Sequence, residues 1–170
     1  MEFVTIFIDM PILAIRHGLS HANNRDNIGT LAFASEQARL MCDGYHQARA
    51  MGKLLIDTYD IDVAHTPVAA SRLLRTQQTA VAAGFLELYC YPQLDEVKHG
   101  MDLLELRTTL DSGKLPPAAI AAAEQTLANP PRQDIWITHG LRIAALCAVL
   151  GVHQNERLIP RFCEVRELPI

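Results

Sequence analysis

The chain has 170 residues, of which 49% are hydrophobic and 20% are charged, and its formal net charge is −4. This length and balance are typical of one globular domain with a substantial core, so we expect a single domain over residues 1–170. The negative charge gives no electrostatic support for nucleic acid or an anionic membrane as a partner. Any phosphate-binding site must therefore be a local positive pocket.

Residues 1–10 are mostly apolar, but they contain Glu2 and Asp9 and lack a basic n-region and a small-residue cleavage site. The stretch is also too short to span a bilayer, so we expect an N-terminal extension and not a signal peptide. The cysteines show no metal-ligand spacing and suit a reducing cytoplasm better than a disulfide framework. They are Cys42, Cys90, Cys147 and Cys163.

The first predicted element is a buried strand over residues 12–15, a short apolar run that ends at a turn. A helix is predicted to begin near Asp43, with this aspartate as its N-cap. Apolar residues then recur at helical spacing along one face of that helix. They are Ala48, Met51, Leu54 and Leu55.

Residues 67–70 are predicted as a second short strand, followed by Ser71 as the cap of a helix over 72–83. Gly84 is expected to end that helix, because glycine readily adopts the left-handed conformation of a C-cap. Residues 86–92 alternate, contain aromatic side chains and end at a proline, which indicates a third strand.

Two short helices between Glu96 and His139 are predicted to form a small cap region over residues 97–133. The nearly all-apolar sequence after His139 predicts a helix that is buried on most sides and ends at Gly151. In chain order, the remaining predicted elements are helices over 101–111 and 117–128, a strand over 134–138, the apolar helix over 141–150, and a strand within 162–168.

Strands that alternate with helices predict an α/β fold, a three-layer αβα sandwich whose mostly parallel central sheet is flanked by helices. In such folds, sites form just beyond the carboxyl ends of the strands. Arg16, His17 and Gly18 follow the first predicted strand, and His139 and Gly140 follow a later one. We therefore expect the two histidines to meet at one end of the sheet.

Two more residues are candidates for the same site. Arg75 lies in the first turn of a predicted helix, and Glu96 lies in the loop after the third strand. Guanidinium groups match phosphate oxygens, histidine can act as a nucleophile or as an acid or base, and a carboxyl group can protonate a leaving oxygen. The set indicates phosphoryl chemistry without a metal.

Five motifs, in order, resemble those of the histidine phosphatase superfamily, which is also called phosphoglycerate mutase-like. They are RHGLSHAN (16–23), LMCDGYHQARAMG (40–52), SRLLRTQQTA (71–80), LDEVKHG (94–100) and ITHGLRIAAL (137–146). The chain departs from the family pattern at Met41, where threonine is usual, and at Arg72, where proline is usual. Neither position has a catalytic role in the family.

The resemblance implies a phosphoglycerate mutase-like fold and a role for each matching residue. His17 would be the nucleophile that becomes phosphorylated, and Glu96 would be the proton donor to the leaving group. The phosphoryl oxygens would be held by Arg16, Arg75 and His139, with Asn23 adding a hydrogen bond and Gly140 allowing close approach. No cofactor or metal is implied. We further expect the two arginines to keep His17 uncharged before substrate binds.

Structural alternatives remain for these residues. Arg16 and His17 could form a polar strand end, Arg75 could lie on a solvated helix face, and Glu96 could be a surface acid like Asp95. Asn23 could serve a turn. A metal pair of His17 and His21 is disfavoured, because Gly18 argues against a helix there and no HExxH motif exists. His21 and His99, and the unassigned residues 25–39, could border the pocket.

The choice between phosphatase and mutase depends on whether the pocket closes over the intermediate. Glu96 and His139 are separated by 43 positions (139 − 96), which leaves little lid material and favours a phosphatase. Glu96 favours small phosphate esters, including sugar or nucleotide-like phosphates, over a phosphopeptide or a phosphohistidine protein. The alternatives are a mutase-type phosphotransferase, a protein phosphohistidine phosphatase and a non-catalytic phosphate-recognition module. The sequence predicts no oligomeric state.

Overall fold

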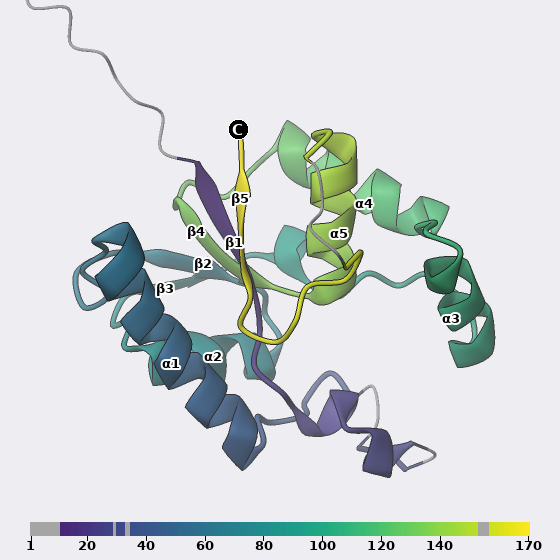
Figure 1. The fold of residues 1–170 in the computed structure, drawn as a ribbon, viewed down its shortest axis with the longest axis horizontal. Helices are drawn as coiled ribbons and strands as arrows, with labels where there is room; N and C mark the ends of the chain where they lie inside the picture. Colours follow the sequence, from purple (N-terminus) through teal and green to yellow (C-terminus); the bar gives the residue numbers. More distant parts are fainter. Residues whose placement is uncertain (1–10, 29, 33–34, 153–156) are drawn as a thin grey trace, which may run out of the picture.

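A computed structural model describes residues 11–28, 30–32, 35–152 and 157–170 of the chain. The predicted N-terminal extension, 1–10, lies outside these residues. Figure 1 shows the helices and strands, which alternate as predicted. In chain order they are β1 (Ile12–Arg16), α1 (Cys42–Tyr59), β2 (Val68–Ala70), α2 (Leu74–Ala83), β3 (Leu88–Cys90), α3 (Leu103–Asp111), α4 (Pro117–Ala128), β4 (Ile135–Thr138), α5 (Gly140–Val149) and β5 (Val165–Leu168).

The sheet has the strand order β3-β2-β4-β1-β5. The β1–β4, β2–β4 and β2–β3 pairs are parallel, and β5 pairs with β1 in the antiparallel direction. In the β1–β4 pair, Arg16 lies opposite Thr138. The carboxyl ends of the two central strands therefore meet at the same edge of the sheet.

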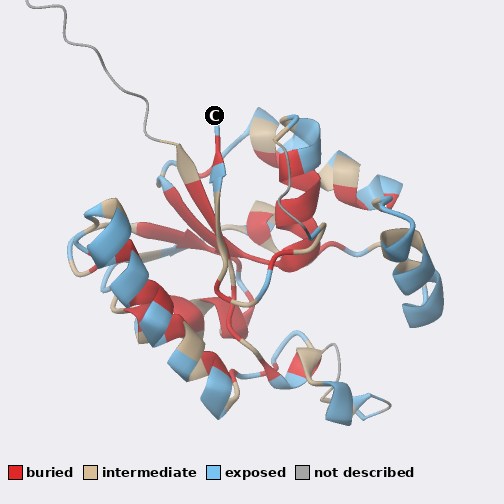
Figure 2. Ribbon diagram, viewed as in Figure 1, coloured by how far each residue is buried: buried red, intermediate tan, exposed pale blue. Residues whose placement is uncertain are grey.

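Helices cover both faces of the sheet, with α1 and α2 on one side and α4 and α5 on the other (Figure 1). Successive residues of β1 point to opposite faces: Leu13 and Ile15 pack in the core under α1 and α2, while Ala14 packs with Trp136 under α4 and α5. Figure 2 shows these two buried layers on either side of the strands. The predicted three-layer αβα sandwich is confirmed.

Two predicted helix caps are wrong. The N-cap of α1 is Met41, and Asp43 lies inside the first turn. Its negative charge still interacts favourably with the helix dipole there. The N-cap of α2 is Leu73, because the Ser71 hydroxyl is engaged by other side chains at the end of β2. Leu54, expected on the buried face of α1, is 44% exposed.

Other local predictions are confirmed. Gly84 ends α2 with a φ of 106°, and residues 140–147 of α5 are all buried, including Cys147. The four cysteines are free. In the predicted cap region, α3 begins after Asp102 and contains no buried residue, whereas α4 packs against α5. No helix in the described part of the chain is long and apolar enough to cross a membrane.

Candidate active site

The sheet brings the two predicted site histidines together. His17 directly follows β1 and His139 directly follows β4, and the backbone N–H of His17 donates to the carbonyl of Thr138 over 3.0 Å. The centroids of the two imidazole rings are 5.1 Å apart. Both side chains are almost fully buried, at 1% and 0% exposure. The expected meeting of the two strand ends is confirmed.

The imidazole of His17 is held in one tautomer. Its Nδ1 lies 2.7 Å from the carbonyl oxygen of Gly18. Because a carbonyl only accepts, Nδ1 must carry the proton, which leaves a lone pair on Nε2. Burial lowers the pKa of His17 well below its usual value, and the charges of His139, Arg75 and Arg16 lower it further. From the sequence we expected the two arginines to keep His17 uncharged, but burial is the larger cause of its lowered pKa.

Arg75 is a buried cation in the first turn of α2, only 3% exposed. Its Nη2 donates to Oε2 of Glu96 over 3.0 Å, and its Nη1 donates to the carbonyl of Ser35 over 3.1 Å. The alternative of a solvated helix face is therefore wrong for Arg75. Ser35 also shows that the unassigned segment 25–39 borders the site.

Arg16 is held by the loop that precedes β5. Its Nη1 donates to the carbonyl of Pro160 over 2.7 Å, and its guanidinium lies over the ring of Phe162, 3.9 Å from the centroid. Burial lowers the pKa of Arg16 to about 10, and the nearby carboxylates of Glu96 and Glu164 oppose that shift. Sequence reasoning missed Phe162, because nothing in its local sequence indicates a partner so distant in the chain.

Glu96 lies between the groups predicted to bind phosphate. Its Oε2 is 3.0 Å from Nδ1 of His139 as well as 3.0 Å from Nη2 of Arg75. Burial alone would raise the pKa of Glu96, but His139 and Arg75 outweigh it and hold the pKa well below its usual range. In this state Glu96 is a carboxylate.

The neighbouring acid, Asp95, has a different partner. Its carboxylate accepts from Arg72 through Nε over 2.8 Å and through the backbone N–H over 2.8 Å. This pair ties the β2–α2 loop to the segment that carries Glu96. Arg72, one of the two departures from the family pattern, therefore positions that segment from outside the site.

Ser71 was predicted as a helix cap, but it is a neighbour of the site. Its hydroxyl lies 2.9 Å from Nε2 of His139 and 2.9 Å from the hydroxyl of Thr76. All three residues are fully buried. The position of Ser71 at the end of a parallel strand, like that of His17 and His139, was the sequence signal for this role.

The site glycines serve close packing within the protein. A Cβ on Gly18 would lie 2.6 Å from the carbonyl oxygen of Gly44 in the first turn of α1. A Cβ on Gly140 would lie 2.7 Å from Cγ2 of Ile159 and 3.1 Å from Nε of Arg16. A side chain at either position would therefore clash with neighbours in the fold. Gly140 also lines the cavity beside His17, and its role in close approach to a substrate stays a prediction.

A cavity of about 160 Å³ opens beside His17. Its polar lining is Arg16, His17, Asn23 and Glu96, which are four of the predicted site residues. The side-chain Oδ1 of Asn23 accepts a hydrogen bond from the hydroxyl of Ser20 over 2.8 Å. The N–H groups of the Asn23 side-chain amide therefore remain available. The predicted mouth residues His21 and His99 do not line this cavity.

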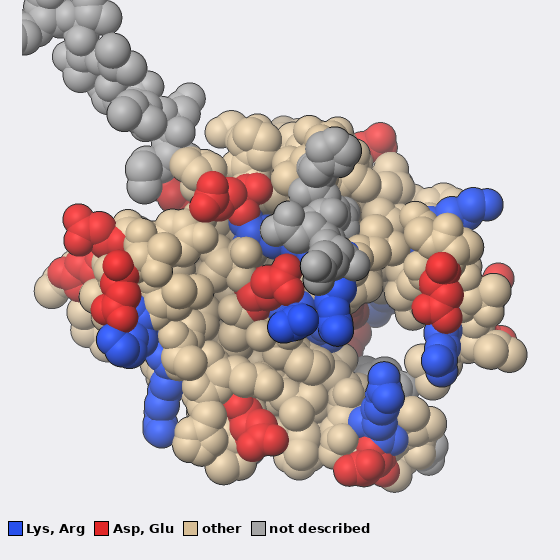
Figure 3. Space-filling model, in the orientation of Figure 1, with Lys and Arg blue, Asp and Glu red and all other residues tan. Residues whose placement is uncertain are grey.

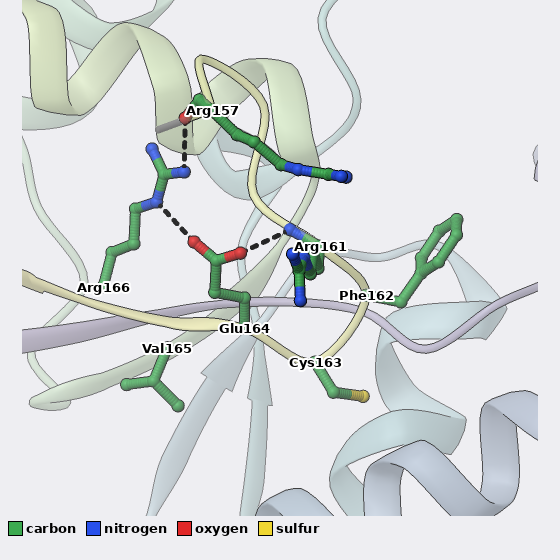
Figure 4. A pocket seen from close by; sticks show the side chains of 7 residues that line it. All are labelled: Arg157, Arg161, Phe162, Cys163, Glu164, Val165 and Arg166. Carbon is green, nitrogen blue, oxygen red and sulfur yellow. Dashed lines mark hydrogen bonds and ion pairs between the residues drawn. The ribbon is translucent and has the colours of Figure 1, made fainter. Parts of the chain in front are cut away.

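A larger cavity, about 680 Å³, lies on the outer side of the loop before β5. Figure 4 shows its lining, in which Glu164 lies between Arg166 and the backbone of Arg161. This cavity contains none of the predicted site residues. We therefore assign the candidate chemistry to the smaller one.

Buried polar atoms without hydrogen-bond partners concentrate at the site. Among the described residues there are four such side-chain atoms, and three of them are Nε of Arg16, Nε of Arg75 and Nδ1 of His139. Nδ1 of His139 is within ion-pair distance of Glu96, but the contact does not have the alignment of a hydrogen bond. Such groups are rare in native proteins, and each one needs an explanation. Arg16 lines the small cavity, whereas Arg75 and His139 lie behind it, in contact with the lining residue Glu96. Three such nitrogens on neighbouring residues are suited to the oxygens of an anion.

Metal binding at the same place is disfavoured. His17, Glu96 and His139 bring ligand-type atoms within 4.8 Å of one another. However, Arg16 lines the same cavity and Arg75 donates to Glu96. Two guanidinium groups at these positions repel a divalent cation. The charge of the site instead suits an oxyanion.

Comparisons with known proteins identify the family and support the fold. The sequence model of the family described as histidine phosphatase superfamily (branch 1) matches residues 12–134. The solved structure of TTHB049 from Thermus thermophilus is similar, with a TM-score of 0.61 and 22% identity over 94% of this chain and 99% of that one. The structure of Rv3214 from Mycobacterium tuberculosis has a TM-score of 0.55 and 20% identity over 84% and 80%. No curated protein sequence matches the chain.

Proposed function

Because the chain belongs to the histidine phosphatase superfamily, we propose that it is a metal-independent phosphatase that hydrolyses phosphomonoesters through a phosphohistidine on His17. The observation that carries this proposal is the set of unpaired buried nitrogens on Arg16, which lines the cavity, and on Arg75 and His139, which contact the cavity residue Glu96. A phosphoryl group supplies the acceptor oxygens that these nitrogens lack. Asn23 adds a further N–H donor from η1 (His21–Asn23).

The reaction has two steps. Nε2 of His17 attacks phosphorus while the bond from phosphorus to the ester oxygen breaks, and that oxygen takes a proton from Glu96. Water, deprotonated by the Glu96 carboxylate, then attacks the phosphohistidine and releases inorganic phosphate and neutral His17. The fixed cations stabilise the charge on the transferring group, which is usually the largest catalytic contribution.

Substrate binding prepares Glu96 as the acid. In the free protein its carboxylate has Arg75 and His139 as partners. A phosphoryl dianion claims the same two donors and places its own charge beside Glu96. Loss of the partners and repulsion by the dianion both raise the pKa of Glu96, so the carboxyl group holds a proton when the leaving group needs one.

Water supplies the acceptor because little material covers the site. Between Glu96 and the start of β4 the chain forms two short helices, α3 of nine residues and α4 of twelve, and α4 packs against α5. That leaves α3 as the covering element. This favours a phosphatase over a mutase-type phosphotransferase, and Glu96 favours ester substrates over phosphohistidine proteins. The expected partner is a small phosphorylated molecule, and the free thiols suit the cytoplasm.

Turnover of para-nitrophenyl phosphate, with and without a chelator, tests the proposal. We expect turnover that the chelator leaves unchanged, that His17→Ala abolishes, and that the exposed His21→Ala retains. A phosphate adduct trapped on His17 at acid quench and seen by mass spectrometry would identify the intermediate. Tight phosphate binding without turnover would instead indicate a phosphate-recognition module and overturn the proposal.

A further inference from the structure

The cavity beside His17 is lined by residues of two kinds. We call Arg16, His17, Asn23 and Glu96 its polar wall, and we call Leu106, Leu110, Leu141 and Ile159 its apolar wall. The proposed reaction uses every side chain of the polar wall to bind, attack or protonate the phosphoryl group and its ester oxygen. The apolar wall has no part in those steps.

The apolar wall comes from three parts of the chain: α3 contributes Leu106 and Leu110, α5 contributes Leu141, and the loop before β5 contributes Ile159. Leu106 and Leu110 are one turn apart on α3, so they share a face, and they are the leucines of that helix that are partly buried. The other leucines of α3, Leu103 and Leu104, are 55% and 74% exposed. Figure 3 shows the surface hollowed beside the part of the molecule that carries α3 in Figure 1.

No polar side chain of the described lining is left for the leaving group. The side-chain Oδ1 of Asn23 already accepts a hydrogen bond from the hydroxyl of Ser20, and the proposed reaction assigns Glu96 and Arg16 to the ester oxygen and the phosphoryl group. A leaving group with many hydroxyls would therefore give up hydrogen bonds to water at this wall without regaining them, which is costly. An alkyl or aryl group would lose nothing and would cover the leucines.

We propose that the preferred substrates are phosphomonoesters of apolar alcohols or phenols, whose hydrocarbon part lies against Leu106, Leu110, Leu141 and Ile159. This deepens the proposed phosphatase function and rests on it. It also narrows the small phosphate esters suggested by the sequence, because sugar phosphates fit this wall poorly.

A series of n-alkyl phosphates, from methyl to hexyl, tests the wall without changing the chemistry, because the leaving alcohols have nearly equal acidity. We expect kcat/KM to rise roughly fourfold for each added methylene until the chain leaves the cavity. Propyl phosphate should exceed glycerol 1-phosphate, which has the same carbon chain with two more hydroxyls. Leu106→Ser should flatten the series, and Leu104→Ser, on the exposed face of the same helix, should leave it unchanged.

The two proposals fail in different ways. If neither the alkyl series nor para-nitrophenyl phosphate is turned over, the phosphatase function itself is wrong. If para-nitrophenyl phosphate is hydrolysed but the series is flat, or glycerol 1-phosphate matches propyl phosphate, the apolar leaving-group site is wrong. A slope that survives in Leu106→Ser would also overturn the assignment of this wall.

Discussion

Replacement of Glu96 by glutamine should tighten oxyanion binding and at the same time slow turnover. In the free protein, Oε2 of Glu96 is 3.0 Å from Nη2 of Arg75 and 3.0 Å from Nδ1 of His139. An oxyanion that binds the unpaired Nε of Arg75 and Nδ1 of His139 must lie beside the charge of this carboxylate. Glutamine has the same shape without that charge.

The size of the effect follows from the distance. Two like unit charges about 3 Å apart, the spacing expected for an oxyanion that lies against Glu96, repel by about 5–6 kcal/mol at an effective dielectric constant of roughly 20. Because the Glu96 side chain is 39% exposed, we reduce this by about half for solvent screening. The remaining ~3 kcal/mol corresponds to roughly 100-fold tighter binding of a dianion by Glu96→Gln.

Calorimetric titration with sulfate measures this change, because sulfate keeps its charge of −2 from pH 5 to 8. The pKa of Glu96 is low in the free protein. We expect the charge of the bound sulfate to raise that pKa, so that binding takes up a proton. The affinity of the native protein should therefore fall with rising pH, by up to about tenfold per pH unit between the two pKa values. Glu96→Gln should lack this slope.

Turnover should move in the opposite direction. Loss of a general acid costs about 10²- to 10⁴-fold, and alkyl phosphates should suffer more than para-nitrophenyl phosphate, whose leaving group needs less protonation. Glu36→Gln, which removes the charge of a carboxylate paired with Lys98 at 3.4 Å on the surface, is the matched control. The reasoning is refuted if Glu96→Gln binds sulfate no more tightly than the native protein.

Three further predictions concern the surroundings of His17. Phe162→Leu should lower kcat/KM roughly fivefold by loosening Arg16, since a cation–π contact is worth about 1 kcal/mol. Phe162→Tyr keeps the aromatic ring and should retain activity. An equal loss in both variants would contradict the role given to the cation–π contact. Ser71→Ala should lower kcat and sulfate affinity about tenfold by leaving buried His139 without its hydroxyl partner, and unchanged kinetics would contradict that role. Because the pKa of His17 is depressed in the folded protein, the unfolded chain protonates this imidazole at a higher pH. The free energy of unfolding should therefore fall as pH drops below 6.5, by up to about 1.4 kcal/mol per pH unit. In urea titrations, His17→Asn should lack that contribution.

The central fold and the meeting of His17 with His139 were predictable, because both depend on patterns that sequence records locally. Short apolar runs alternate with helical periodicity, and a polar side chain that follows a buried parallel strand has one edge of the sheet to occupy. The helix caps were less predictable. Asp43 and Ser71 have good capping chemistry, but α1 begins earlier and the hydroxyl of Ser71 is engaged by His139.

The residues that support the site from a distance were not predictable. Pro160 and Phe162 hold Arg16 from a position 144 residues or more along the chain, and Ser35 reaches Arg75 from a segment without periodicity. Irregular loops carry no repeating pattern, so their contacts follow only from the packed structure. By residue type alone the neighbours Asp95 and Glu96 were equivalent. The family resemblance chose Glu96, and the structure gives the two acids different partners.

The pairing of β1 with β4 has a consequence for how this centre can change. His17 and His139 each lie one residue beyond the paired positions Arg16 and Thr138. The distance between the two imidazoles is therefore set by the pairing of β1 with β4 and not by contact between the rings. Substitutions around the rings leave that spacing intact, whereas insertion of a single residue in either strand would turn one imidazole to the opposite side of the sheet. Variation in length is therefore confined to the connecting segments, where new specificities can arise without moving the two histidines.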